Sequence, residues 1–555
     1  MHKGKKIWKR FFAAILSAVM IAGSVTGGMS GRMANAAEAT VKSTVENSAD
    51  SEEKNWYVLG RPMTEEEKEE QRKLIEYYNS LSSGSVAEQN SNIFASEAQT
   101  FGAPAAASDR IEPIVTAAAL PSSYSSRDLG YTPAVRNQGN LGNCWAHAST
   151  AAVEISMVKN NVIAREDVDL SEEHLIYYIC RPVRDPFGGT EDQDLVILND
   201  TVYFMFHNGG SIGYSAASFL GWMGPVQAED FYTYDYLLQN HNDKSQLAGL
   251  DDAEHAYGKK AAIVIETIEV ANGQRDAMKQ AIMDYGSLGI HYYSGGNYFE
   301  YDYAAQYCPD YISADHAVTA VGWDDNFPKE NFRQTPPGDG AWLVRNSWGS
   351  GHGDGGYFWL SYYDNTMSGG RAYKAVSPDK YDYNYRYDTT GSNGSYINAV
   401  ENGTIESVNI FEIKNDQEVL NAVQFATQWS NTHYSIQIYK NPENPKVPAS
   451  GTALLEEPIK GTKAISGRYT ADIGKTILLE KGDKIAVSVT FSSDNPLVVP
   501  GAPIEGTYHC LAGRSIYRIN GGDWIDCADQ GMGNFLIRAF TSDAAEKIIE
   551  QYFLA

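Results

Sequence analysis

The chain has 555 residues, a length that suggests about three or four domains rather than one compact core. Hydrophobic residues make up 43% and aromatic residues 12%, which excludes a chain that is disordered throughout. The formal net charge is −26. We therefore expect no nucleic-acid partner, because phosphate binding needs clustered Lys and Arg, and we interpret the acidity as favouring solubility outside the cell.

The first 36 residues have the three parts of a secretory signal peptide. Lys3–Arg10 is rich in basic residues, Phe11–Ala22 is apolar, and Ala34–Ala36 supplies the small residues of a cleavage site. A membrane anchor is the alternative, but an apolar run ended by Gly23 is short for a membrane span. We therefore expect residues 1–36 to be removed, and the protein to be secreted, extracellular and without membrane association after cleavage.

Residues 37–119 show little sustained hydrophobic pattern. The exception is a charged helix predicted over Glu65–Glu76, and Ser-, Ala- and Gly-rich stretches follow it. This composition is typical of a propeptide or linker rather than of a packed domain.

A glycine-punctuated loop runs into a predicted helix at Cys144, after which Ala148 and Ala152 share one helical face. The N-terminus of a helix favours an anion, so we expect the pKa of this thiol to be lowered. Gln138 lies one loop upstream, where its amide can donate to a developing oxyanion beside the Cys144 N–H. A buried structural cysteine is the alternative. With a candidate base later in the chain, the pattern favours a nucleophile.

Predicted helices and strands alternate over the next part of the chain. Leu170–Tyr178 is predicted to be a helix with Ser171 as its N-cap. Glycines at Gly209 and Gly210 then indicate a turn. Further elements are a strand at 261–265, a helix at 275–285, and strands at 290–293 and 317–321, with His316 at the start of the last strand.

The pattern changes after residue 379. Residues 380–395 carry Tyr-Asp repeats and a Gly-Ser stretch, which indicate a linker. Alternating runs around Ile436 and Val487 then predict a β-sandwich over 396–541, with a C-terminal tail at 542–555. Since every catalytic candidate precedes the boundary, we expect a separable sandwich. The alternative is a sandwich that packs against the preceding part as a required brace.

Three separated blocks carry a family resemblance. Gln138–Ala146 resembles the catalytic loop and helix start of the papain-like cysteine peptidases, while Asp315–Val318 and Asn346–Gly349 resemble two later blocks of that family. We assign this domain to residues 120–379. The resemblance implies an α+β fold with a helical lobe and a β-rich lobe, followed here by the all-β sandwich domain.

The resemblance also implies a role for each site residue. Cys144 would attack as the thiolate, His316 would be its imidazolium partner and later the proton donor, and Asn346 would orient the imidazole. Gln138 and the Cys144 N–H would form the oxyanion hole. Trp348 would shield the bond between His316 and Asn346 from water.

For substrate binding we assign Gly209, Gly210, Asp315 and Trp348. The two glycines resemble the family's loop that pairs with an extended substrate, and a residue without Cβ lets a peptide approach the backbone closely. His147 stands where family members commonly have an aromatic residue. We expect it to pack or make a polar contact rather than act as a second base.

These assignments predict a secreted cysteine peptidase acting on peptide or protein substrates, without a cofactor or metal. A catalytically inactive scaffold serving as a surface adhesin or binding module is the alternative, and the complete set of site residues argues against it. The family's inhibitory segment would fall in residues 37–119. Residues 396–541 resemble the lectin-like domains of some secreted bacterial members, which suggests cell-surface or glycosylated targets.

The chain contains five cysteines, Cys144, Cys180, Cys308, Cys510 and Cys527. A reactive thiol must stay unpaired, which leaves four for at most two bridges, and the sequence does not fix their pairing. Cys510 and Cys527 are the pair that proximity favours. The family's bridge through a cysteine three positions before the nucleophile is absent, because Leu141 stands there.

Overall fold

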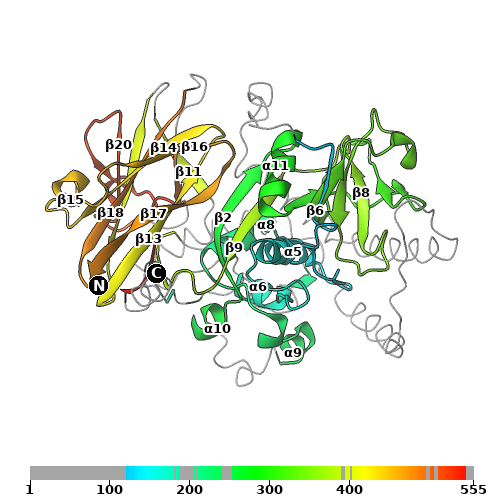
Figure 1. Cartoon of the computed structure of the whole chain (residues 1–555), viewed down its shortest axis with the longest axis horizontal. Coiled ribbons are helices and arrows are strands. Elements are labelled where there is room, and N and C mark those ends of the chain that lie inside the picture. The colour runs from blue at the N-terminus through cyan, green and yellow to red at the C-terminus, as the bar shows by residue number, and fades with distance from the viewer. Residues whose placement is uncertain are drawn as a thin grey trace, which may run out of the picture. The chain divides into compact units, whose positions relative to one another are not determined.

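The computed structural model describes residues 120–179, 183, 185–186, 189, 206–207, 209–240, 253–388, 394–399, 403–494, 501–505 and 510–544. The predicted signal peptide, the predicted propeptide or linker at 37–119, Cys180 and residues 545–555 lie outside this part of the chain. Figure 1 labels the elements.

The first part of the fold is built around helix α5, Cys144–Lys159, which buries 14 of its 16 residues. A helix buried on nearly all sides belongs in a core, and α5 packs against α6 and α8 and against strands β6 and β9 (Figure 1). The predicted N-cap of α6 is confirmed, because the backbone N–H of His174 donates to Ser171 Oγ at 3.0 Å. The helices are α5, α6 (Glu172–Ile179), α8 (Ile212–Leu220), α9 (Tyr234–Asn240), α10 (Ala253–Tyr257) and α11 (Arg275–Tyr285), with 3-10 turns at Ala228–Asp230 and Lys329–Asn331.

A mostly antiparallel sheet lies against these helices. Its central strand β6 is buried along nearly its whole length, so side chains on both of its faces are covered. Along the sheet the order is β2-β9-β3-β6-β7-β8-β5-β4, and β1 pairs with β6. The strands are β1 (Ser123–Ser125), β2 (Ile263–Val270), β3 (Leu288–Tyr292), β4 (Phe299–Glu300), β5 (Ala305–Gln306), β6 (His316–Asp324), β7 (Ala341–Arg345), β8 (Tyr357–Ser361) and β9 (Gly370–Val376).

The second part is the predicted β-sandwich. One sheet has the order β15-β14-β18-β12-β20-β21 with β16 on β14, and it faces strands β10-β22-β13-β17. Phe425 and Phe491 meet between the two layers, with ring centroids 6.3 Å apart. The strands are β10 (Tyr383–Tyr385), β11 (Gly394–Asn398), β12 (Ile405–Glu412), β13 (Gln417–Thr427), β14 (Thr432–Lys440), β15 (Thr452–Ala453), β16 (Ile459–Lys463), β17 (Ser466–Glu480), β18 (Lys484–Ser492), β19 (Gly501–Glu505), β20 (Ser515–Ile519), β21 (Ile525–Asp526) and β22 (Ile537–Asp543), with 3-10 turns at Pro448–Ser450 and Ala528–Gln530.

Strand β17 joins the two parts, because it pairs with β2 as well as with β13. Side chains reinforce this pairing: Thr470 Oγ1 and Gln424 Nε2 both donate to the carbonyl of Ile265, at 2.6 and 2.8 Å. Residues 380–395 were expected to form a linker, but the first part of this stretch contains a strand. Strand β10 lies inside it and pairs with β22, since its backbone groups complete that edge of the sandwich.

The expected bridge between Cys510 and Cys527 is not present, and all four cysteines that the structure describes are free thiols. Both side chains are buried. Burial raises the pKa of each thiol, so both are neutral in the folded chain.

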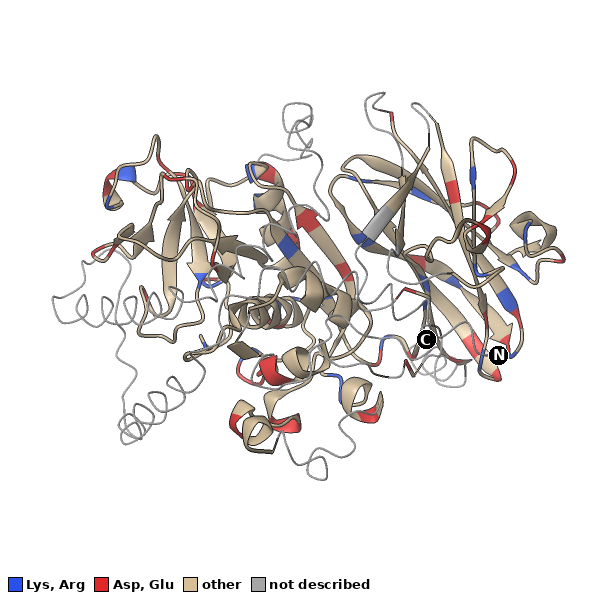
Figure 2. Ribbon diagram, turned by 180° about the vertical axis from the view of Figure 1, so that it is seen from behind, with Lys and Arg blue, Asp and Glu red and all other residues tan. Residues whose placement is uncertain are grey.

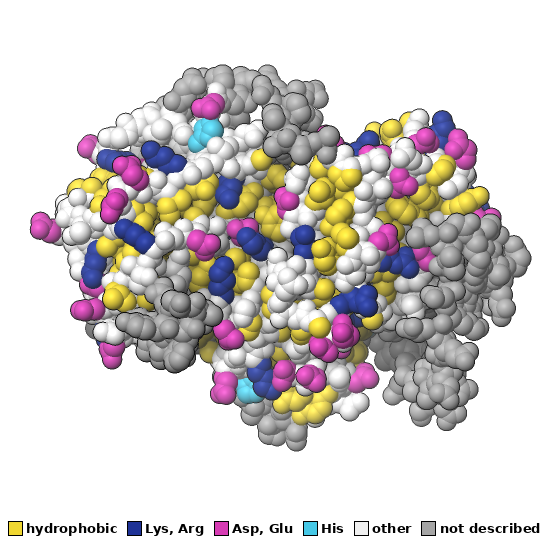
Figure 3. All heavy atoms as spheres, viewed as in Figure 1, with side chains coloured by type: hydrophobic (Ala, Val, Ile, Leu, Met, Phe, Trp, Pro, Cys, Tyr) yellow, Lys and Arg dark blue, Asp and Glu magenta, His cyan; other side chains and the backbone are white. Residues whose placement is uncertain are grey.

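Charged side chains are distributed without a dominant basic surface on the views shown. Acidic residues gather on the short helices α9 and α10 and the turn before them (Figure 2). On the face in Figure 3, Lys and Arg are interspersed with Asp and Glu. Within the described ranges, no helix is both long and apolar enough to span a membrane.

Candidate active site

The candidate nucleophile Cys144 is the first residue of α5, as the sequence predicts. Its side chain is buried, and Sγ accepts a hydrogen bond from the backbone N–H of Ala317 at 3.4 Å. Ala317 follows His316 at the start of β6. The sulfur thus contacts a residue 173 positions later in the chain, next to the candidate base, where α5 packs on β6.

The candidate base His316 lies beside Asn346, the residue proposed to orient it. Its Nε2 lies 2.8 Å from Asn346 Oδ1, which also accepts from the N–H of Ser347. Asn346 directly follows β7, and the antiparallel pairing of β6 with β7 brings the two side chains together. A carbonyl oxygen only accepts, so Nε2 carries the proton and Nδ1 is the unprotonated nitrogen of the neutral ring.

Trp348 covers this pair. Its ring stacks on the His316 imidazole with centroids 4.8 Å apart and planes inclined by 23°. Trp348 is itself buried, at 4% exposure. A hydrogen bond under an aromatic ring is removed from competing water, which strengthens it in the low local dielectric.

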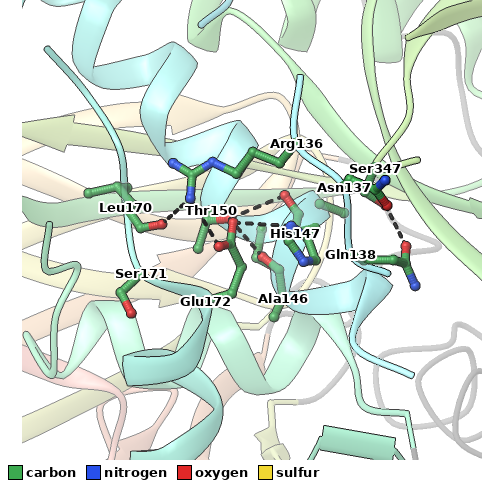
Figure 4. Close-up of polar contacts among 12 residues, drawn as sticks. Arg136, Asn137, Gln138, Ala146, His147, Thr150, Leu170, Ser171, Glu172 and Ser347 are labelled. Carbon is green, nitrogen blue, oxygen red and sulfur yellow. Dashed lines mark hydrogen bonds and ion pairs between the residues drawn. The ribbon is translucent and has the colours of Figure 1, made fainter. Parts of the chain in front are cut away.

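Gln138 is held in place by the loop that follows Asn346. Its N–H donates to Ser347 O at 2.8 Å, and Ser347 Oγ donates to its side-chain Oε1 at 2.6 Å (Figure 4). Its Nε2 donates to Leu141 O at 2.9 Å. One amide N–H remains for an oxyanion. Ser347 was not among the predicted site residues, although it lies inside the Asn346–Gly349 block.

The glycine pair packs directly on the start of the Cys144 helix. A Cβ on Gly210 would lie 2.2 Å from Cε2 of Trp145, and a Cβ on Gly142 would lie 2.5 Å from His207 O. Gly209 has φ of +73°, a value that favours glycine. The loop that we assigned to the substrate backbone is thus in contact with the nucleophile loop.

Asp315 directly precedes the candidate base and makes two hydrogen bonds with backbone groups. Its Oδ1 accepts from the N–H of Ser294 at 2.7 Å, and its own N–H donates to Tyr292 O at 3.1 Å. Burial raises the pKa of this carboxyl to about 6. Asp315 therefore fixes the entry to β6 through backbone hydrogen bonds.

The electrostatics differ from the expectation of a lowered thiol pKa. Burial raises the pKa of Cys144 to about 11, and burial lowers the pKa of His316 to about 4 despite the Asn346 hydrogen bond. Desolvation outweighs the helix terminus, because each charge alone is poorly solvated in this site. Burial thus favours the neutral thiol and the neutral imidazole in the absence of substrate.

A second polar network joins α5 to α6. It contains the polar contact expected of His147, but its other members were not predicted. Glu172 Oε1 accepts from Thr150 Oγ1 at 2.6 Å and lies 3.2 Å from His147 Nδ1, while its Oε2 accepts from Arg136 at 3.0 Å (Figure 4). Arg136 also pairs with Glu154 of α5. The signal available in the sequence was the pair of acidic residues, Glu172 and Glu173, that opens this helix.

Comparison with protein-family models gives two matches. A model described as papain family cysteine protease matches residues 120–378, and one described as lectin like domain matches residues 384–541. Within the described ranges, no three His, Cys, Asp or Glu side chains are grouped as metal ligands.

Curated relatives resemble the first part of the chain. Macrodontain-1 of Ananas macrodontes is 27% identical over 270 residues, which are 47% of this chain and 97% of that protein. Oryzain beta chain of Oryza sativa subsp. japonica is 24% identical over 269 residues, 47% of either protein. Cathepsin L1 of Drosophila melanogaster is 26% identical over 243 residues, 43% of this chain and 53% of that protein. The chain thus spans about half the length of the last two relatives.

A solved structure resembles both parts. The cysteine protease and lectin-like domains of Cwp84, described as a surface layer associated protein of Clostridium difficile, align with a TM-score of 0.61 and 25% identity. The alignment covers 78% of this chain and 91% of the other. A structure of Cwp84 after propeptide cleavage gives a TM-score of 0.60 at 25% identity, over 76% of this chain and all of the other.

Proposed function

We propose that this chain, which carries a papain-family cysteine protease domain followed by a lectin-like domain, is a secreted cysteine peptidase that hydrolyses peptide bonds. The observation that carries the proposal is the place of the Cys144 sulfur beside the start of β6, where His316 contacts Asn346. His316 Nε2 lies 2.8 Å from Asn346 Oδ1, and the Cys144 sulfur accepts from the backbone N–H that follows this histidine. Nucleophile, base and orienting group are the parts that acyl transfer through a thioester requires.

In the proposed reaction, Cys144 gives its proton to His316 Nδ1 while its sulfur attacks the substrate carbonyl carbon. Asn346 keeps Nε2 protonated, so the imidazole faces sulfur with its basic nitrogen. The imidazolium then protonates the leaving amine, and the carbon–nitrogen bond breaks to give an acyl-enzyme. Water, deprotonated by His316, then attacks the thioester carbon. The carbon–sulfur bond breaks, the carboxylic acid product leaves, and the imidazolium returns its proton to sulfur.

Two donors serve the oxyanion of each tetrahedral intermediate. One is the backbone N–H of Cys144 at the start of α5. The other is the remaining amide N–H of Gln138, whose oxygen is anchored by Ser347. Donors fixed before the reaction stabilise developing charge without reorganising, which is the largest electrostatic contribution in many hydrolases.

We infer an extended peptide or protein as substrate. Gly209 and Gly210 lie in contact with the nucleophile loop, and backbone groups of such a pair can hydrogen-bond a peptide strand. Asp315 and Trp348 were also predicted to take part in substrate binding. Here they would act by holding His316 in place, Trp348 through its ring and Asp315 through the start of β6.

For residues 384–541 we propose a targeting role toward cell-surface or glycosylated proteins. The support is the lectin-like family match and the likeness to Cwp84, a surface layer associated protein.

A signal peptide at residues 1–36 and a propeptide within 37–119 complete this proposal of an exported enzyme. A catalytically inactive adhesin is the second candidate, and it predicts binding without hydrolysis.

Labelling with a thiol-directed epoxide separates these two candidates. Active protein should carry one label on Cys144, and the label should be lost in Cys144→Ala and strongly slowed in His316→Ala. Hydrolysis of a set of small fluorogenic peptides should disappear with the same variants. A chain freed of residues 37–119 that neither reacts with the epoxide nor cleaves any peptide would favour the adhesin.

A further inference from the structure

Helix α8 begins at the glycine pair that we assign to substrate binding. Gly209 and Gly210 lead directly into its N-cap, Ser211. Ser211 Oγ accepts from the N–H of Gly213 at 3.0 Å, so this loop is bonded to the first turn of the helix. From there α8 runs to Leu220 as one rigid element, and a contact that fixes its far end also fixes where the glycine pair lies.

The far end of α8 is held by side chains of the β-sandwich. The carbonyl of Leu220, the last residue of the helix, accepts hydrogen bonds from Arg538 Nη1 and from Asn384 Nδ2, the latter at 3.3 Å. The last carbonyls of a helix have no partner within the helix, and the helix dipole favours a cation at this end. Arg538 lies on β22 and Asn384 on β10, so the lectin-like part supplies the C-terminal cap of a peptidase helix.

A buried carboxylate fixes Arg538 in this position. Arg538 Nε donates to Asp388 Oδ1 at 2.9 Å, and Arg538 Nη2 donates to Asp388 Oδ2 at 2.5 Å. Such a bidentate contact sets the plane of the guanidinium, which leaves Nη1 directed at Leu220 O. Arg468 of β17 donates to the same carboxylate at 2.6 Å. Burial opposes ionisation of Asp388, but the charges of Arg538 and Arg468 hold its pKa below its usual range, so the contact is an ion pair.

The near end of α8 has little room to move. A Cβ on Gly210 would lie 2.2 Å from Cε2 of Trp145 at the start of α5. Beyond the far end, Trp222 packs on Phe540 of β22 with ring centroids 5.1 Å apart. The same strand of the sandwich therefore contacts the end of α8 through Arg538 and the turn after it through Phe540. A shift of this strand would move α8 and displace the glycine pair against the nucleophile loop.

We propose that Arg538, held by Asp388, is a positioning residue for peptide binding: it fixes the C-terminal end of α8 and thereby the place of the glycine pair. The proposal rests on the proposed peptidase function. Backbone contacts between a glycine pair and an extended peptide form when the substrate binds and persist through the reaction. A misplaced pair therefore weakens binding of the substrate and of the transition state alike, which raises KM and leaves kcat nearly unchanged.

The test measures kcat and KM on one small peptide for the wild type, Asn384→Ala, Arg538→Lys and Arg538→Met, at a temperature where each is folded. Arg538→Met removes the charged donor to α8, so KM should rise roughly tenfold, whereas loss of the neutral donor in Asn384→Ala should raise it roughly threefold. Arg538→Lys keeps a cation at the helix end and should fall between Arg538→Met and the wild type. In all of these variants kcat should stay within about twofold of the wild type.

Arg518→Met is the matched control. Arg518 pairs with Glu406 on the sheet of the sandwich that does not continue into the peptidase, so its loss should change neither kcat nor KM. A lower kcat at unchanged KM, or unchanged constants in folded Arg538→Met, would overturn the proposal. If Arg538→Met does not fold, Asn384→Ala decides in its place, and an unchanged KM in that variant would count against the proposal in the same way.

A second measurement does not need activity. In the Cys144→Ala background, amide hydrogen exchange over residues 209–220 should become faster when Asn384→Ala or Arg538→Met is added, because the end of α8 opens more often. Exchange in α11 is the internal reference and should stay as in the parent. Equal acceleration in both helices would show general loosening and would overturn the proposal. If the wild type cleaves no peptide, the proposed function fails, and hydrogen exchange still decides whether Arg538 positions α8.

Discussion

Ser347 Oγ donates a 2.6 Å hydrogen bond to Gln138 Oε1, although the two residues are 209 positions apart. A backbone bond from Gln138 N–H to Ser347 O, at 2.8 Å, runs beside it. The loop that supplies Asn346 therefore also anchors the proposed oxyanion donor, so the base and the oxyanion hole share one support.

This anchor gives the first prediction. Gln138→Ala should lower kcat by roughly a hundred- to a thousandfold, the usual result of losing one oxyanion donor, and Ser347→Ala by roughly tenfold because the donor remains but is less fixed. The double variant should have the same kcat as Gln138→Ala alone, because the donor that Ser347 fixes is already absent. Steady-state kinetics of the three variants measure this, and fully additive effects would show that Ser347 acts independently of Gln138.

The second prediction concerns the order of importance around His316. His316→Ala removes the proton acceptor and should abolish turnover, as should Cys144→Ala. Asn346→Ala leaves a base that is wrongly oriented part of the time, so its loss in kcat should be smaller than that of His316→Ala. If Asn346→Ala were the more damaging of the two at equal thermal stability, the roles assigned to them would be wrong.

The sequence predicts the parts of this site better than its electrostatics. The block around Cys144, His316 at a strand start and helix 275–285 are all found where local pattern places them. The raised pKa of Cys144 could not be predicted from local pattern. Position at a helix start is a local property, whereas burial of the thiol depends on β6 packing against α5. The His147–Glu172 contact likewise joins two helices, and no local spacing encodes it.

The third prediction uses the contact between Gly210 and Trp145. A methyl group on Gly210 would overlap the Trp145 ring, so Gly210→Ala should cost about 2 kcal/mol of stability and impair turnover by shifting the start of α5. Gly351→Ala is the matched control, because a Cβ there meets nothing within 4 Å. Its stability should change by less than about 0.5 kcal/mol. Equal denaturation midpoints for the two variants would argue against close packing at Gly210.

The fourth prediction is a pH dependence of stability. The folded pKa of Glu172 is depressed, so its contribution is complete above the unfolded value near 4.3 and is lost as pH falls below it. Glu172→Gln should therefore cost about 3 kcal/mol at pH 7, as expected when one partner of a buried ion pair is removed. The difference from the wild type should shrink below about pH 4.

The adjacent Glu173 is the control for this experiment. Burial and repulsion from Glu172 raise its pKa, so folding favours its neutral form and Glu173→Gln should not destabilise the protein. Urea denaturation of both variants at pH 7 and at about pH 3 measures the difference. A Glu172→Gln penalty that does not change with pH would show that packing rather than charge is responsible.

The last prediction concerns the junction between the two parts. The sequence pattern favours a separable sandwich, whereas the pairing of β17 with β2 favours a sandwich that braces the peptidase. A chain ending at Lys380 would leave β2 with an unpaired edge and the Ile265 carbonyl without two donors. It would also uncover Trp222, which packs on Phe540 with ring centroids 5.1 Å apart. We expect this truncated chain to aggregate or to melt roughly 10 °C lower than the full chain.

A substitution inside the sandwich tests the brace without truncation. Phe491 is buried in β18, in the sheet that does not continue into the peptidase, so Phe491→Ala creates a cavity worth about 3–5 kcal/mol there. If the two parts unfold together, this variant lowers the temperature at which small-peptide hydrolysis is lost, although no catalytic residue is touched. If the two parts are independent, calorimetry shows two transitions, and only the transition of the sandwich moves to lower temperature. Hydrolysis then persists up to the temperature at which the wild type loses it. That outcome would support a separable sandwich domain.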